Sequence, residues 1–260
     1  MTCALCGHDR PLKNSHFAPK HAYRRFGGMT APGTSVMRSS KGKIFNSDRQ
    51  ITQNLLCGEC ECRFSRNGEN YFAEIAMPSA DQKTPPLLFR ILRVTLIPAW
   101  NRMGVSRFSF GSGLYPEIDS KAIYYYAISL FWRGGLDGWR DYEKMKYTDE
   151  LTEMMKNFLL GGDYISGHII RVIPSFWRQK YGFVLPVYRK NVPFFSMYMY
   201  DFYLEECPRN FFRVNAADSA PVFYTADSSA SMETHCEMIS AINSGHRAKA
   251  LQGSDDLVSW

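Results

Sequence analysis

Two widely separated Cys-x-x-Cys pairs limit the folds open to this chain more than any other feature of its sequence. Cys3 and Cys6 form the first pair, and Cys57 and Cys60 form the second. Four thiolates in two such pairs are the donor set of a tetrahedral, structural zinc site. We therefore expect these cysteines to bind one structural Zn²⁺. The second pair suits the first turn of a helix, as in treble-clef zinc domains, where the helix dipole favours bound thiolates.

The other cysteines and the start of the chain favour a reducing compartment. The seven cysteines are odd in number, and no secretory segment precedes Cys3. No apolar run reaches the roughly 18–20 residues of a membrane span. We expect a cytoplasmic protein without membrane contact or disulfides. Cys62 and His8 are alternative zinc ligands, although a packed Cys62 and an exposed His8 are the preferred interpretations.

Positive charge is concentrated in the N-terminal part of the chain. The formal net charge is +6, and residues 1–50 hold two Asp and no Glu. Such an excess permits, without demanding, binding to a polyanion. The basic residues that we expect to contact nucleic acid, most simply DNA, are Lys20, Arg24, Arg25, Lys41 and Lys43. The alternative for these side chains is an ordinary solvated face.

Residue patterning predicts an α+β fold in four segments. A zinc-stapled domain spans residues 1–76, and a Pro- and Ser-rich linker spans residues 77–86. A mixed α+β domain with amphipathic helices and a small antiparallel sheet covers residues 87–225, and a loosely structured tail covers residues 226–260. Hydrophobic residues make up 45% of the chain, which is enough for a core that needs zinc only near the N-terminus.

The pattern also predicts individual elements. In the first segment we expect strands at Pro11 to His16 and Ile51 to Leu56, a helical turn at Pro19 to Phe26, a long basic loop at 27–49, and a helix at Glu61 to Ile75 that is weakened at Asn67-Gly68. Beyond it we expect strands at Leu87 to Val94, Ser106 to Phe110, Ile169 to Ile173, Gly182 to Tyr188 and Pro193 to Tyr200, and helices at Ser120 to Arg133, Asp141 to Leu160 and Glu233 to Ile242.

Several motifs together resemble the HNH-type, ββα-metal endonuclease domain of bacteria. The first pair is followed by Ser-His-x-x-Pro-Lys at residues 15–20, and Leu-Leu-Cys-x-x-Cys-Glu at residues 55–61 opens the predicted helix. Glu69 with Tyr71 and Phe72 continues the resemblance, and so does the segment Ala127 to Arg133. The resemblance covers residues 1–76 well and little beyond them.

This resemblance implies hydrolysis of phosphodiester bonds in DNA. His16 matches the histidine that acts as general base, and Ser15 and Glu61 match positions that ligate a catalytic Mg²⁺ or another divalent cation. The family usually has Asp or His in place of Ser15, and His or Asn in place of Glu61. Asn46 or Asp48 could complete a rearranged site, and the central Asn of the family could correspond to Asn54 or Asn46. The resemblance also implies a role in anti-phage defence.

The departures at Ser15 and Glu61 leave a second function open. A catalytically silent, zinc-stapled module would bind nucleic acid or a protein through the same basic face. His16 would then brace the hairpin, and Glu61 would interact favourably with the N-terminus of a helix. In either case, the residues after 86 would provide specificity or contact a protein partner.

Overall fold

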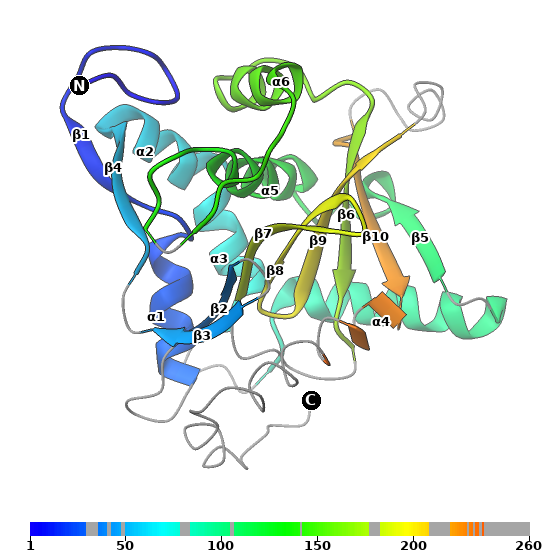
Figure 1. Ribbon diagram of the computed structural model, residues 1–260. Helices are drawn as coiled ribbons and strands as arrows, with labels where there is room; N and C mark the ends of the chain where they lie inside the picture. The colour runs from blue at the N-terminus through cyan, green and yellow to red at the C-terminus, as the bar shows by residue number, and fades with distance from the viewer. Residues whose placement is uncertain are drawn as a thin grey trace.

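The fold combines a small N-terminal hairpin, a mixed six-stranded sheet and helices that pack between and around them (Figure 1). The computed structural model describes residues 1–29, 36–40, 43–47, 50–78, 84–104, 107–140, 142–176, 183–207 and 219–227, with residues 229, 230, 232, 233 and 236. Within these residues, no helix has both the length and the apolar character needed to cross a bilayer. Most of the predicted helix at Glu233 to Ile242 and of the predicted tail lies outside them.

The N-terminal hairpin brings the two cysteine pairs together. β1 (Leu12–His16) pairs in antiparallel fashion with β4 (Thr52–Cys57), so that Leu12 lies opposite Cys57. α1 (Lys20–Met29) follows β1 directly. Both predicted strands and the predicted helical turn are therefore confirmed.

The prediction of one long loop at residues 27–49 is wrong. α1 extends to Met29, and β2 (Val36–Ser40) and β3 (Lys43–Ser47) form an antiparallel hairpin in which Ser40 pairs with Lys43. The Gly, Ser and Lys content of this stretch suggested a loop. Val36, Ile44 and Phe45 instead supply the β-branched and aromatic residues that favour strands.

A nearly continuous helical segment follows the second cysteine pair. α2 (Gly58–Phe64), a π-helical turn (Ser65–Glu69) and α3 (Asn70–Ala76) succeed one another without a break. This confirms the predicted helix, and its predicted weak point at Asn67-Gly68 lies within the π-helical turn. Phe64 and Phe72 are fully buried, as expected.

The first element after the linker is a helix, so the strand predicted at Leu87 to Val94 is wrong. α4 (Leu87–Met103) buries Leu88, Phe89, Leu92 and Leu96, which follow a helical period. The short apolar run alone is compatible with a strand or a helix, whereas the helical period across all seventeen residues of α4 indicates a helix.

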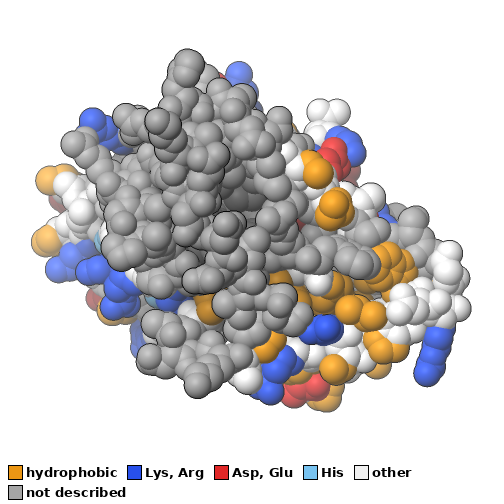
Figure 2. Space-filling view, turned by 90° about the horizontal axis from the view of Figure 1, so that it is seen from below, with side chains coloured by type: hydrophobic (Ala, Val, Ile, Leu, Met, Phe, Trp, Pro, Cys, Tyr) orange, Lys and Arg blue, Asp and Glu red, His pale blue; other side chains and the backbone are white. Residues whose placement is uncertain are grey.

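Figure 2 shows the lower side of the molecule, obtained by turning the view of Figure 1 by 90°. Among the described residues on this side, hydrophobic side chains alternate with those of Lys and Arg.

Two further helices differ in how completely they are buried. α5 (Ser120–Gly134) is buried at every residue except Lys121, as its apolar sequence predicted. α6 (Asp149–Leu159) begins later than the predicted start at Asp141, because the hydroxyl of Thr148 caps it by accepting the N–H of Leu151. Tyr142 and Met145 therefore precede the helix.

The sheet is larger than predicted and is mixed. The strands are β5 (Arg107–Gly111), β6 (His168–Pro174), β7 (Phe183–Arg189), β8 (Val192–Met197), β9 (Tyr200–Glu206) and β10 (Val222–Asp227). Their order in the sheet is β5-β10-β6-β9-β8-β7, and among these pairings only that of β10 with β6 is parallel. The run Pro193 to Tyr200, predicted as one strand, instead contains the turn at Tyr198-Met199.

One hydrophobic cluster runs through the whole fold. It extends from Cys3 to Ala226 and includes α5, which lies between the cysteine-bearing hairpin and the sheet (Figure 1). Rings of α5 contact both sides, since Tyr126 stacks on Phe72 and also meets Phe202 of the sheet. The buried side chains of residues 1–76 and of the later segment thus form one core.

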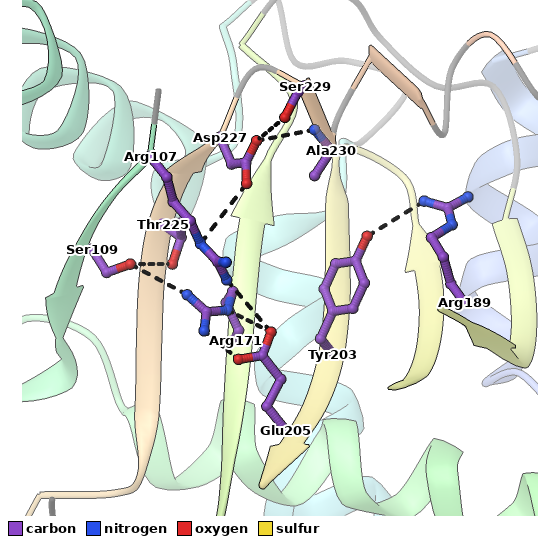
Figure 3. Close-up of polar contacts among 10 residues, drawn as sticks. All are labelled: Arg107, Ser109, Arg171, Arg189, Tyr203, Glu205, Thr225, Asp227, Ser229 and Ala230. Atoms are coloured by element: carbon purple, nitrogen blue, oxygen red, sulfur yellow. Dashed lines mark hydrogen bonds and ion pairs between the residues drawn. The ribbon is translucent and has the colours of Figure 1, made fainter. Parts of the chain in front are cut away.

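The other face of the sheet carries a polar network and a second, smaller apolar cluster. Arg171 forms an ion pair with Glu205, and Arg107 lies between Glu205 and Asp227 (Figure 3). The small apolar cluster contains Ile173, Val184, Phe194 and Tyr203.

Candidate metal centre and basic pocket

The four cysteines of the two pairs form a compact cluster. The Sγ atoms of Cys3, Cys6, Cys57 and Cys60 all lie within 4.8 Å of one another. The first pair lies in a turn in which the N–H of Gly7 donates to the carbonyl of Cys3. Gly7 has a φ of 73°, which a residue without a side chain adopts at little cost. The second pair spans the junction between β4 and the first turn of α2.

The local electrostatics favour a thiolate at Cys3. Burial raises the pKa of its thiol, but hydrogen bonds from the backbone of Cys57, Cys6 and Leu5 lower the pKa to about 7. One of these bonds joins the N–H of Cys57 to the Sγ of Cys3 at 3.3 Å. Burial raises the pKa of Cys60, and its neighbouring thiols raise it further. A cation at the centre would favour thiolates at all four positions.

The donor set and spacing fit a tetrahedral metal ion. Zinc–sulfur bonds of about 2.3 Å place the sulfurs of a tetrahedron about 3.8 Å apart. The Sγ atoms of Cys6 and Cys57 are separated by 3.9 Å. The cluster can therefore hold a metal ion such as zinc. Cys62 and His8 are exposed and are not members of this cluster.

Ser15 is turned into the hairpin. Its side chain is fully buried, and its hydroxyl accepts the N–H of Leu56 at 3.1 Å. The register of β1 and β4 shifts between Lys13 and Asn14, next to this hydrogen bond. The hydroxyl therefore supports the hairpin, and its expected role as a ligand for a divalent cation stays a prediction.

His16 and Glu61 lie on different elements. His16 is the last residue of β1, half-buried, with its ring 6.4 Å from the ring of Tyr23. Glu61 lies in α2, where its Oε1 is buried without a hydrogen-bond partner, and it lines a pocket of about 600 Å³ with Cys62 and Ser65. Among the described residues, no group of three or more His, Cys, Asp or Glu besides the cysteine cluster brings its ligand atoms comparably close.

The expected basic residues divide into two kinds. Lys20 and Arg24 are exposed on α1. The guanidinium of Arg25 instead donates to the carbonyls of Ala73, Met77 and Pro78, at 2.6, 2.7 and 3.2 Å, and so satisfies the C-terminal end of α3. Lys41 lies outside the described residues, and Lys43 is the first residue of β3.

The structure adds a basic pocket that sequence patterning missed. A pocket of about 600 Å³ lies between α1 and the segment from the π-helical turn to α3. His21 lines it and has a buried Nε2 without a hydrogen-bond partner. A histidine next to Lys20 and one turn before two arginines was the available signal. The lining consists of Lys20, His21, Arg24, Arg25, Ser65, Glu69, Asn70, Ala73 and Glu74.

A buried ion pair lies behind this pocket. Arg133 of α5 donates to Glu69 at 2.7 Å, and both side chains are almost inaccessible to solvent. The same guanidinium donates to the carbonyl of Phe17 at 3.3 Å and lies over the ring of Phe64. Arg133 therefore connects α5 to Phe17, which directly follows β1, and to Glu69 in the π-helical turn.

Comparison with known proteins gives no relative for this chain. No protein-family model, no curated protein sequence and no solved structure matches it. The geometry of the cysteine cluster and of the basic pocket is therefore the basis for inferring a function.

Proposed function

We propose that this chain binds nucleic acid, with DNA as the expected ligand, through an N-terminal unit stapled by Zn²⁺. The observation that carries this proposal is the position of Lys20 and Arg24. Both are exposed on the helix that follows β1, and β1 pairs with the strand that leads into the second cysteine pair. Exposed cations on a rigid scaffold are suited to phosphate contacts, which dominate affinity for nucleic acid.

Fluorescence anisotropy with a labelled DNA duplex at several salt concentrations tests this proposal. The double variant Lys20→Gln/Arg24→Gln should bind more weakly, and the slope of log K against log salt should fall by about 2. The control is Arg93→Gln, which removes an exposed charge from α4. A double variant that binds as the original chain does, or an equal loss in the control, would refute the role of α1.

Hydrolysis of the bound strand is a second candidate function, favoured by Glu61. A buried carboxylate oxygen without a partner is costly unless a cation or a proton donor completes it. Carboxylate oxygen suits Mg²⁺, and a neutral His16 could activate water. The four-cysteine site would have no open position for this chemistry.

Plasmid nicking with Mg²⁺ or Mn²⁺ tests the second candidate. His16→Ala and Glu61→Gln should each abolish nicking while metal content and folding persist. His8→Ala is the matched control, because His8 is exposed beside the cysteine cluster. Absence of nicking by the original chain, together with salt-dependent binding, would assign a silent binding module.

A further inference from the structure

The pocket between α1 and α3 has the volume of a small-molecule site. Its volume of about 600 Å³ lies within the range of roughly 300–1,000 Å³ that is usual for ligand pockets. Residues far apart in sequence build it, since Lys20 and Arg24 come from α1, whereas Ser65 and Asn70 come from the segment after the second cysteine pair. This arrangement exists only in the folded chain.

The charges around the pocket leave an excess of positive charge. Glu69 is neutralised by Arg133, and Arg25 is committed to backbone carbonyls. The exposed cations that remain are Lys20 and Arg24, opposed by the exposed carboxylate of Glu74. An anion that entered here would meet two exposed cations and one exposed carboxylate.

His21 also lines this pocket. Its Nε2 is buried and has no hydrogen-bond partner. Burial lowers the pKa of His21 to about 4, and the nearby charges of Arg25, Arg24 and Arg133 act in the same direction. The imidazole is therefore neutral at pH 7, and His21 adds a polar, uncharged ring to the lining of the pocket.

We propose that this pocket binds a phosphate monoester, carried by a nucleotide or by the phosphorylated end of a nucleic-acid strand. Lys20 and Arg24 would balance the two negative charges of the monoester, and His21, Ser65 and Asn70 would contact its oxygens. A monoester fits better than an internal phosphodiester, because a diester carries one charge and exposes fewer oxygens. The inference rests on the proposed function for the class of ligand, and it adds the recognition of a strand end.

Binding of matched oligonucleotides tests the inference. A single strand with a 5′-phosphate and the same strand without it are titrated separately, and AMP is used as the competitor. The phosphorylated strand should bind about tenfold more tightly, which corresponds to one charge-assisted contact. Ser65→Ala and Arg24→Gln should reduce this preference, while His168→Gln on the sheet should leave it unchanged. AMP should displace the phosphorylated strand.

The results separate this inference from the proposed function. Equal, salt-dependent binding of both strands, without displacement by AMP, would overturn the monoester site and leave nucleic-acid binding intact. No binding of either strand, with no binding of AMP, would overturn both. Competition by AMP without any preference between the strands would support a nucleotide site and exclude recognition of strand ends.

A measurement on the unmodified chain makes the test independent of variant folding. NMR titration should show that AMP raises the pKa of His21 from about 4, because the phosphate charge favours the imidazolium. The charges that act on this ring are those of Arg24 and Arg25 on α1 and of Arg133 on α5, and Glu69 and Glu74 line the same pocket. A His21 pKa that AMP does not change would contradict binding in this pocket.

Discussion

At the scale of single residues, hydrogen-bonding geometry decides roles that residue type leaves open. Ser15 stands where the resemblance implies a metal ligand, yet its hydroxyl accepts the backbone N–H of Leu56 on the paired strand β4. Arg25 belongs to a basic cluster in the sequence, yet it satisfies three carbonyls near the end of α3. A sequence lists donors and acceptors, but their partners depend on the fold.

Ser15→Ala should destabilise the protein by about 1–3 kcal/mol, because the buried N–H of Leu56 loses its acceptor. Urea unfolding measures this loss. Ser129→Ala is a suitable control, since Ser129 is equally buried but donates to the carbonyl of Tyr126 one turn earlier in its own helix. Equal losses in the two variants would contradict the role assigned to Ser15.

The pair Glu69–Arg133 should be strongly coupled. Glu69→Gln or Arg133→Met should each cost about 3–5 kcal/mol, because each leaves a charge or its hydrogen bonds buried without a partner. The double variant should cost less than the sum of the two. Glu59→Gln, which breaks the exposed pair with Arg10, should cost little, because solvent screens that pair. Additive losses in a double-mutant cycle would show that the pair is not coupled.

At the scale of elements, the close approach of two backbones explains why a glycine occupies the π-helical turn. A Cβ atom on Gly68 would lie 2.7 Å from the backbone nitrogen of Tyr126 and 3.0 Å from the carbonyl oxygen of Ala122. The π-helical turn therefore packs directly on the backbone of α5. Sequence patterning identified Asn67-Gly68 as a weak point, but the reason for the glycine lies in another helix.

Gly68→Ala should destabilise the protein by about 1–3 kcal/mol through overpacking against α5. Thermal unfolding and the near-ultraviolet circular dichroism of the tyrosines measure the effect. Gly58→Ala is the matched control at the start of α2, where the nearest atom to a new Cβ is the flexible Cε of Lys13 at 3.5 Å. The control should be neutral or slightly stabilising, and a neutral Gly68→Ala would refute the close packing.

At the scale of the whole molecule, the metal centre and the sheet share one core. The hydrophobic cluster that contains Cys3 and Cys57 also contains α5 and the inner face of the sheet. A metal that fixes the hairpin therefore stabilises contacts far from the cysteines, and its binding free energy contributes to folding.

Chelation should lower the melting temperature of the entire chain in a single transition, and metal analysis should find about one zinc per chain. Cys57→Ser should lose the metal and the stability together. Cys62→Ser should retain both, because Cys62 is exposed and outside the cluster. A metal-free chain with an unchanged melting temperature would refute the structural role of the cluster.

Local spacing along the chain is sufficient to predict several features. Two Cys-x-x-Cys pairs specify a four-sulfur donor set, and the apolar pattern of residues 120–133 specifies a buried helix. Most strands were also predictable, because β-branched and aromatic runs between turns favour extended backbone. In contrast, the short apolar run at Leu87 to Val94 is compatible with either a strand or a helix.

Which distant groups meet depends on tertiary packing. The parallel pairing of β10 with β6, the contact of Gly68 with α5 and the pocket around His21 each join segments that are far apart in sequence. Such contacts depend on the global packing that repays the entropy of closing long loops. The cysteines thus specify where the chain can bind a metal, whereas the fold creates the basic pocket between α1 and α3.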